Sequence, residues 1–240
     1  MSIYAAADLH GYPAELLRDM LDKAGYCDDD TLYILGDVID RMGDGGLSLL
    51  DFAMKSPNTE FILGNHEAML LSCAFLFTEV TEKAAASLGT GDMESLDMWM
   101  RNGGGVTAEN IRRRIRKEPG FAEDLMDFLK DAPLFRAVSA GGRDYILVHG
   151  GLGGFSPDKK LKDYTPFELV WARPSSAERY RDDVMTVLGH TPTFIYGEEH
   201  RGKVLFTDTW IDIDTGAGWG EAPALIRLDD LRTFYGIKRR

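Results

Sequence analysis

The chain has 240 residues, of which 44% are hydrophobic and 28% are charged, and its 27 basic and 39 acidic side chains give a net charge of −12. A chain of this size and composition can bury a large core, which excludes a disordered chain, a collagen-like fibre and a disulfide-stapled miniprotein. Because an acidic protein repels phosphate backbones and anionic lipids, we expect neither sequence-independent nucleic-acid binding nor membrane binding. An anionic substrate would need a local cation to recruit it.

The chain contains two cysteines, Cys27 and Cys73. Two cysteines form no disulfide framework, and free thiols in a reducing cytoplasm are a better interpretation than a single disulfide between them. The apolar run that ends at Asp8 has no basic segment before it, so it does not resemble a secretion signal. No stretch reaches the roughly 20 apolar residues of a membrane span. We therefore expect a cytoplasmic protein.

The first third of the chain alternates between strand and helix patterns. Short apolar runs predict strands at residues 3–7, 31–35 and 61–63, and each run ends in a polar turn. Apolar residues at helical spacing follow each strand, at residues 16–21, 47–52 and 69–75. This β-α-β-α-β-α order predicts a mostly parallel sheet with helices on its faces.

The rest of the chain divides into a helical segment and a second group of strands. Residues 78–131 show helical patterns throughout, with breaks at glycines and at one Pro-Gly pair. Strand patterns return at residues 134–138, 145–148, 184–188, 204–206, 211–213 and 224–228. We predict one α/β domain over residues 1–240, with a helical insertion at about 78–131.

Polar side chains follow five of the strand-like runs. They are Asp8, His10, Asp37, Asn65, His66, His149 and His190. Side chains at the carboxyl ends of strands converge on one crevice in open α/β sheets, so carboxylate, amide and imidazole groups would meet there. Such a mixed ligand set suits Mn, Fe or Zn better than Mg or Ca alone.

Each of these residues has a simpler explanation when it is taken alone. An Asp after a strand is usually a turn former or a helix cap, and a lone His is more often a core residue than a ligand. The distribution of histidines argues against that explanation, because four of the five follow strand-like runs. The fifth, His200, lies in a polar stretch and is expected in a surface loop. The sequence therefore favours a metal site.

Six short blocks of the sequence are similar to a known signature. They are Asp8-Leu9-His10-Gly11, Gly36-Asp37-Val38-Ile39-Asp40-Arg41, Gly64-Asn65-His66-Glu67, His149-Gly150-Gly151, Trp171-Ala172-Arg173-Pro174 and Gly189-His190-Thr191-Pro192. Together they resemble the calcineurin-like metallophosphoesterases, in the phosphoprotein phosphatase branch, and they follow that family's order. The resemblance implies a four-layer α/β/β/α sandwich.

The resemblance also implies a centre of two metal ions. The first ion would be held by Asp8, His10 and Asp37. The second would be held by Asp37, Asn65, His149 and His190, so that Asp37 bridges the pair. Manganese is the best fit, with iron or zinc as alternatives, and a hydroxide between the ions would attack phosphorus in line with the leaving oxygen. No covalent phosphoenzyme is implied.

Other family positions imply electrostatic and acid roles. Arg41, Arg173 and Asn65 would bind the phosphoryl oxygens of the substrate. His66 would protonate the leaving oxygen and would be oriented by Asp40.

Several features lie outside these roles. Met42 follows Arg41, where the family usually has glycine, and a bulky residue would be strained there if the backbone needs a positive φ. Glu67 is expected to serve the first turn of the following helix, without a catalytic role. The segment 99–105, with three glycines and a Trp, resembles a segment of bacterial relatives and is interpreted first as a helix end and turn.

Two basic segments have simple explanations. Residues 111–117 form a basic helix patch, interpreted as a solvated face, with a cationic rim for an anionic substrate as the alternative. Residues 238–240 are expected to be a frayed basic tail.

Three functions stay open on the sequence. The first choice is a metal-dependent phosphomonoesterase, most like a bacterial Ser/Thr protein phosphatase acting on phosphorylated protein. The alternative is a symmetrical dinucleoside tetraphosphate hydrolase, whose purine would need a stacking partner such as Phe155, Trp171 or Trp219. The third is a non-catalytic scaffold that retains the fold, which the complete set of candidate ligands disfavours.

Overall fold

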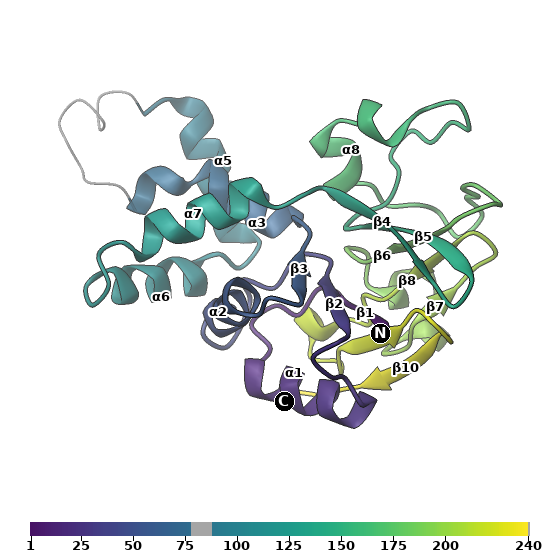
Figure 1. Ribbon diagram of the computed structural model, residues 1–240. Helices are drawn as coiled ribbons and strands as arrows, with labels where there is room; N and C mark the ends of the chain where they lie inside the picture. The colour runs from purple at the N-terminus through teal and green to yellow at the C-terminus, as the bar shows by residue number, and fades with distance from the viewer. Residues whose placement is uncertain (78–87, 240) are drawn as a thin grey trace.

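Two five-stranded sheets form the centre of the computed structural model, which describes residues 1–77 and 88–239 (Figure 1). The first sheet has the order β10-β9-β1-β2-β3, with β1 (Ile3–Ala6), β2 (Thr31–Ile34), β3 (Thr59–Phe61), β9 (Ala224–Arg227) and β10 (Arg232–Tyr235). The second has the order β4-β5-β6-β8-β7, with β4 (Phe135–Ala140), β5 (Arg143–Val148), β6 (Met185–Leu188), β7 (Leu205–Phe206) and β8 (Trp210–Asp212). The parallel arrangement predicted for the first three strands is therefore confirmed, and the later strands β4 to β8 form a sheet of their own.

Parallel strands occupy the middle of each sheet and place their carboxyl ends side by side. In the first sheet β1, β2 and β3 are parallel, with Ala6 opposite Ile34 and Ile34 opposite Phe61, whereas β9 and β10 are antiparallel. In the second sheet β5, β6 and β8 are parallel, with Leu147 opposite Val187. The loops that follow these strands therefore leave from neighbouring positions.

The strands are apolar at successive positions because both faces of each sheet are covered. In β1, Tyr4 and Ala6 pack against the helices, whereas Ile3 and Ala5 pack into the core between the sheets. That core takes residues from both sheets: Tyr33, Tyr145, Leu147, Val187, Ile211 and Ile226 are all buried. A sheet buried on both faces gives a continuous apolar run instead of an alternating one.

Helices cover the outer face of the first sheet. They are α1 (Ala14–Ala24), α2 (Leu47–Lys55) and α3 (Asn65–Ser72), with the turn η1 (Ala74–Phe77) after α3. Helix α1 starts directly after Pro13 and ends at Gly25, whose φ of 78° is the left-handed conformation that suits glycine at a helix end.

The outer face of the second sheet has a thinner cover. It consists of α8 (Pro166–Val170) and irregular segments with the short turns η2 (Leu161–Asp163) and η3 (Thr193–Tyr196). Two further turns, η4 (Glu198–His200) and η5 (Ala217–Trp219), lie in the loops before β7 and after β8. Leu169 of α8 packs with Val148, Leu188 and Trp210 of the sheet. The layers are thus helix, sheet, sheet and a partly helical cover, which confirms the four-layer sandwich.

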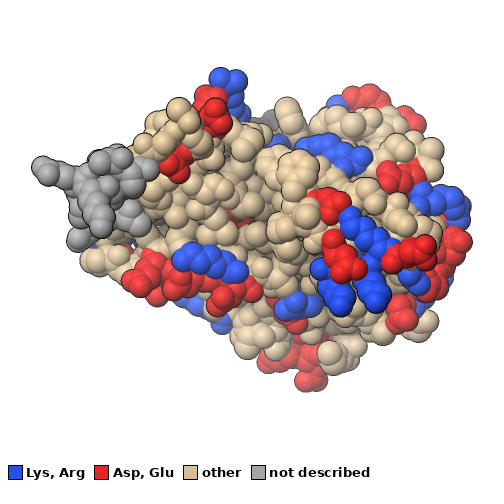
Figure 2. Space-filling model, turned by 90° about the horizontal axis from the view of Figure 1, so that it is seen from above, with Lys and Arg blue, Asp and Glu red and all other residues tan. Residues whose placement is uncertain are grey.

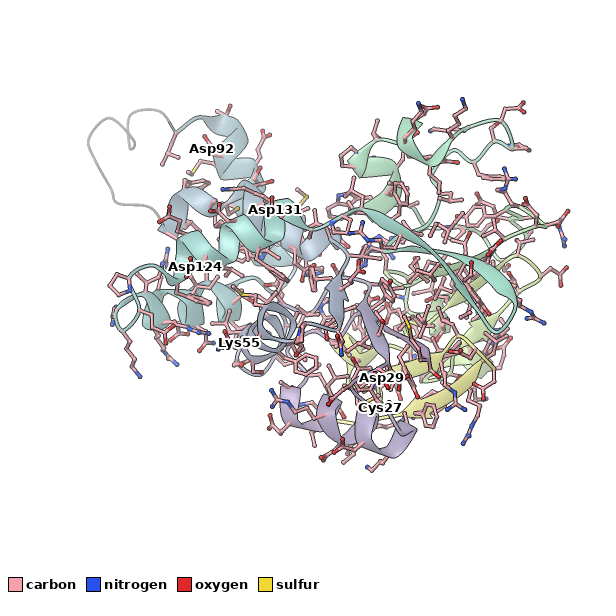
Figure 3. The ribbon with its side chains drawn as sticks, in the orientation of Figure 1. Cys27, Asp29, Lys55, Asp92, Asp124 and Asp131 are labelled. Carbon is pink, nitrogen blue, oxygen red and sulfur yellow. The ribbon has the colours of Figure 1, made fainter. Side chains whose placement is uncertain are left out.

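The predicted insertion forms a helical lobe beside α3, at the left of Figure 1. Its helices are α5 (Thr90–Arg101), α6 (Gly105–Ile115) and α7 (Phe121–Asp131). The first part of the predicted segment, residues 78–87, lies outside the described residues. Figure 3 labels Asp92 on α5 and both Asp124 and Asp131 on α7, where they add acidic charge to the surface of the lobe.

Both cysteines are free thiols, as predicted. Cys27 is exposed in the turn before β2, where Figure 3 labels it beside Asp29, and Cys73 is buried after α3. Within residues 1–77 and 88–239, no helix combines the length and the apolar character needed to cross a membrane.

Candidate metal centre

The loops that carry the candidate ligands have an unusual backbone. Six of their residues are left-handed although they are not glycine: Asp8, His10, Asp37, Asp40, Arg41 and His190, with φ from 40° to 73°. Elsewhere in the part of the chain that the structure describes, only Leu231 shares this feature among non-glycine residues. Each such position costs about 1–3 kcal/mol, and strain of this kind clusters at functional sites.

Backbone hydrogen bonds join the loops after β1 and β2. The amide of Asp8 donates to the carbonyl of Gly36 at 3.1 Å, and that of His10 donates to the carbonyl of Asp37 at 3.0 Å. A Cβ atom on Gly36 would lie 2.4 Å from the Cα of Gly64, so the loops after β2 and β3 touch where only glycine fits. Three strand ends are thereby held in contact.

Asp37 lies at the centre of the candidate ligands. The Nε2 atom of His149 is 3.3 Å from its Oδ1, and the Nε2 atoms of His66 and His10 are 3.7 and 3.9 Å from its Oδ2. Its carboxylate belongs to two groups whose ligand atoms lie within 4.8 Å of one another, His10-Asp37-His66 and Asp37-His149-His190. Burial raises the pKa of Asp37, but the charges of the histidines outweigh it and hold that pKa well below its usual range.

Two of the histidines are oriented by backbone carbonyls. The Nδ1 atom of His149 lies 2.6 Å from the carbonyl of Leu35, and that of His10 lies 2.9 Å from the carbonyl of Ile39. With Nδ1–H donating to these oxygens, each ring turns Nε2 toward Asp37, which is the arrangement found at metal-binding histidines. Asn65 adds its Oδ1 atom 2.9 Å from Nε2 of His149.

His190 supplies a test of whether the site fits a metal ion. Its backbone amide donates to Oδ2 of Asp8 at 2.8 Å, which fixes the residue in place. Its Nε2 atom is buried and has no hydrogen-bond partner among the described residues. Burial and the charge of His149 lower the pKa of His190 to about 2, so the ring is neutral and offers a lone pair. A metal ion would satisfy this orphaned ligand atom, and the residues present therefore fit one.

Two further buried acids lie close to Asp8 and were not predicted. Asp212 ends β8, its Oδ2 atom has no partner within the described part of the chain, and burial raises its pKa well above the usual value. Burial also raises the pKa of Asp214 to about 6. Burial, Asp214 and Asp37 in turn raise the pKa of Asp8 well above its usual value. The signal was in the sequence, because Asp212 lies in the strand predicted at residues 211–213 and Asp214 directly follows it, but neither lies in one of the six blocks.

His66 and Asp40 form a buried pair. The Nδ1 atom of His66 donates to Oδ2 of Asp40 at 2.7 Å. Burial lowers the pKa of His66, but Asp37 and the hydrogen bond to Asp40 outweigh it and raise that pKa above its usual value. His66 therefore holds a proton more readily than a free imidazole does.

Two arginines approach the centre from opposite loops. Nη2 of Arg41 lies 3.4 Å from Nε2 of His66, and the guanidinium of Arg41 lies over the ring of Trp219 at 5.2 Å. Nη1 of Arg173 donates to the carbonyl of His190 at 2.9 Å and to Oγ1 of Thr191 at 3.1 Å. Arg41 contacts His66 and Arg173 contacts the loop of His190, so both arginines lie beside the candidate metal centre.

Met42 has no positive φ, so the condition under which it would be strained is not met. The residues on either side of it, Arg41 and Gly43, are left-handed. Gly43 stands one position later than the glycine of the family, and the positive φ angles of this turn fall on the residues before and after Met42.

Glu67 does more than serve its own helix. Its carboxylate accepts hydrogen bonds from the amide of Gly64 at 3.2 Å and, across the loops, from the amides of Asp37, Val38 and Ile39 at 2.8, 3.0 and 3.3 Å. It therefore fastens the start of α3 to the loop that carries Asp37.

Two of the five basic side chains in residues 111–117 form ion pairs within the described part of the chain. Arg113 pairs with Glu109, and Arg114 pairs with both Asp51 and Glu118, which agrees with a solvated face for residues 111–117. Figure 2 shows basic and acidic side chains interspersed on the face seen from above.

The expected frayed tail is wrong for the residues described. Nη1 of Arg239 donates to the carbonyl of Gly11 at 2.7 Å, beside the loop that carries His10, and Lys238 pairs with Glu221.

The fold and the site define an α/β protein with a buried His/Asp centre suited to metal ions. The chain matches the family model of calcineurin-like phosphoesterases over residues 1–213, and it belongs to that family. The resemblance drawn from the six blocks is thus confirmed.

Similar proteins carry two kinds of name. Symmetrical bis(5'-nucleosyl)-tetraphosphatases from Actinobacillus succinogenes and Buchnera aphidicola are 33% and 31% identical, over 66% and 98% of this chain. The match covers 46% of the former, less than half its length, and 97% of the latter. Serine/threonine-protein phosphatase 2 of Salmonella typhimurium is 27% identical over 90% of this chain and 87% of its own.

Solved structures share the fold at low identity. A candidate diadenosine tetraphosphatase superposes with a TM-score of 0.63 at 14% identity, covering all of this chain and 94% of that one. A Ser/Thr protein phosphatase from Saccharomyces cerevisiae gives 0.59 at 15% identity, covering all of this chain and 81% of that one.

Proposed function

We propose that the chain is a metal-dependent phosphoesterase that binds two divalent ions. The observation that supports this most strongly is the convergence of His and Asp ligand atoms on Asp37, together with the orphaned Nε2 of His190. The first ion would be held by Asp8, His10 and Asp37, and the second by Asp37, Asn65, His149 and His190. Mixed nitrogen and oxygen donors favour manganese, with iron or zinc as alternatives. When bound, the ions would activate a water molecule and neutralise charge on the phosphoryl oxygens.

The chain's own residues would bind the phosphoryl group and move a proton. Arg41 and Arg173 flank the cluster and, with Asn65, would bind phosphoryl oxygens. His66, held at Nδ1 by Asp40, would give its Nε2 proton to the leaving oxygen as the bond to phosphorus breaks.

A nucleoside polyphosphate is the substrate that we favour. Trp219 is 63% exposed, and its ring lies beside the guanidinium of Arg41. Together with Arg101, Asn102 and Gly103 these residues line a hollow of about 380 Å³. An exposed indole next to a phosphate-binding arginine gives a base a face to stack on, worth about 1–3 kcal/mol. A symmetrical dinucleoside tetraphosphate would suit this arrangement, as the names of several relatives suggest.

The other two sequence-based candidates for stacking are less suitable. Phe155 packs against Tyr180 in the outer core of the second sheet, with ring centres 5.2 Å apart. Trp171 is partly buried, and its edge meets the ring of His190 at 5.9 Å.

A phosphorylated protein is the second candidate substrate. Phe167 is 71% exposed and stacks on Trp171, so an exposed apolar surface lies beside the His190 loop. An apolar side chain of a phosphopeptide could pack against this surface.

Two matched variants distinguish the substrates. We expect Trp219→Ala to raise KM for diadenosine tetraphosphate about tenfold, the loss of one stacked base, while Phe167→Ala leaves it unchanged. With a phosphoserine peptide the reverse pattern would favour the protein phosphatase. Turnover of p-nitrophenyl phosphate by both variants shows whether Arg41 and the metal site are intact. If neither variant changes KM for either substrate, both substrate assignments are contradicted.

A further inference from the structure

Asp40 is held from the side of the helical lobe. The indole Nε1 of Trp99 on α5 donates to Oδ2 of Asp40 at 2.9 Å, the same oxygen that accepts from His66. The hydroxyl of Thr107 on α6 donates to Oδ1 at 2.6 Å and lies 3.0 Å from the backbone amide of Asp40. Both carboxylate oxygens and the amide of this residue are therefore partnered by the lobe.

The contacts are fully enclosed. Asp40, Trp99 and Thr107 each have 0% exposure. A buried carboxylate is tolerated only when its oxygens are hydrogen-bonded, so these donors decide which rotamer Asp40 adopts. No water could replace a lost donor without space for it.

The glycines of segment 99–105 are explained by the same contacts. A Cβ atom on Gly104 would lie 2.5 Å from the indole of Trp99, and the carbonyl of Gly103 accepts from the amide of Arg41 at 3.2 Å. On the facing loop, a Cβ atom on Gly45 would lie 2.6 Å from the Cα of Thr107. The backbone of the loop after β2 is thus in van der Waals contact with the helical lobe. This contact places the indole of Trp99 and the hydroxyl of Thr107 within hydrogen-bond distance of Asp40.

We propose that Trp99 and Thr107 are positioning residues for proton donation by His66, an inference that rests on the proposed function. They fix Asp40, and Asp40 fixes the ring of His66 through Nδ1–H. As the bond between phosphorus and the leaving oxygen breaks, the Nε2 proton passes to that oxygen and the ring becomes neutral. The lobe thereby takes part in the acid step without touching the substrate.

A merely structural role makes a different prediction. If Trp99 and Thr107 only anchored the lobe, their loss would lower the turnover of all substrates alike. A defect in proton donation instead depends on the leaving group, because a more basic leaving oxygen needs its proton more. Phenyl phosphate and p-nitrophenyl phosphate provide this contrast, since phenolate is the more basic of the two.

The experiment compares kcat for the two esters in manganese-loaded variants. Thr107→Val keeps the shape of the side chain and Trp99→Phe keeps an aromatic ring, and both remove the hydrogen-bond donor. We expect each to lower kcat for phenyl phosphate about 10-fold. For p-nitrophenyl phosphate we expect a change of less than about 3-fold, with KM unchanged for both. Thr107→Ser keeps the hydroxyl and should restore kcat for phenyl phosphate.

Two controls complete the design. Trp210→Phe removes an equally buried indole donor, which bonds to the carbonyl of Glu178 outside the site, and it should not separate the two esters. His66→Asn should show the same leaving-group pattern as Trp99→Phe, but more strongly.

Each other outcome overturns a stated claim. Suppose that His66→Asn lowers kcat more for phenyl phosphate than for p-nitrophenyl phosphate, but that Trp99→Phe and Thr107→Val lower kcat equally for both esters or not at all. That result would overturn the positioning role alone. Failure of His66→Asn to separate the esters would overturn the acid role in the proposed function, and the positioning role with it.

Discussion

At the scale of single residues, the candidate metal centre contains groups that destabilise the metal-free fold. Buried acids crowd around Asp8, whose pKa is raised by burial and by the charges of Asp214 and Asp37. Six left-handed residues add backbone strain. Both features destabilise the metal-free fold. A bound cation would offset the repulsion between the buried acids.

Asp212 gives a direct test of this destabilisation. Because burial raises the pKa of Asp212 well above the usual value, its carboxyl keeps its proton to a higher pH in the folded chain than in the unfolded chain. The folded state thus binds more protons, so this group lowers the free energy of unfolding as pH rises. In chelator, Asp212→Asn should therefore be more stable than the parent by about 1 kcal/mol or more near pH 7, with a smaller difference near pH 4.

Chemical denaturation at several pH values measures that difference. The exposed Asp182, which pairs with Arg179 on the surface, provides the control, since the loss of an exposed ion pair in Asp182→Asn should change the stability little. A stability loss in Asp212→Asn that is constant with pH would show that the carboxyl is ionised in the fold.

At the scale of elements, α3 and the loop after β2 act as one unit. Glu67 joins them through the three loop amides and the amide of Gly64. The carboxylate is fully buried, so its removal would leave these donors unsatisfied.

We expect Glu67→Ala to lower the free energy of unfolding by about 3 kcal/mol. It should also weaken manganese binding about 10–100-fold, because the loop carrying Asp37 loses its support. Thermal unfolding and isothermal titration measure the two effects. Glu168→Ala is the matched control, since Glu168 caps α8 at the amide of Thr165, away from the candidate ligands. Equal manganese affinity in Glu67→Ala and the parent would contradict the coupling.

The strands that carry the candidate ligands could be predicted, and the boundaries that differ do so by one or two residues. Strand β3 starts at Thr59, before its apolar run, because its pairing with β2 continues past the hydrophobic residues. Strand β10 was missed, since Arg232–Tyr235 forms an exposed antiparallel edge with little apolar pattern.

The sequence could not predict contacts between distant elements. The candidate ligands were found because each follows a strand, and position along a strand can be read from local pattern. Trp99 and Thr107 follow no such rule, because their approach to Asp40 depends on how α5 and α6 pack on the loop after β2. Local pattern also does not say which strands pair, so the second sheet was expected only from the resemblance to the family and not from the strand patterns.

At the scale of the whole molecule, the proposed metal ions would connect the two sheets. Asp8 and Asp37 follow strands of the first sheet, whereas His149 and His190 follow strands of the second. Ions bound between them act as a cross-link that only the folded chain can form.

Chelation should therefore lower the melting temperature. Free manganese at about 100 times its Kd adds about 2.7 kcal/mol, which corresponds to about 5–10 °C for a chain of this size. Calorimetry with and without EDTA measures the shift, and Asp37→Asn should not show it. An unchanged melting temperature of the parent would mean that no metal binds the fold under these conditions.

The central claim is that Asp37 organises a metal site that hydrolyses phosphoesters. The measurement that tests it most directly is phosphate release from p-nitrophenyl phosphate by metal-stripped protein with manganese added back, beside the Asp37→Asn variant. We expect turnover that requires manganese and falls by at least about 100-fold in the variant. Turnover in the presence of chelator, or equal activity in Asp37→Asn, would contradict it.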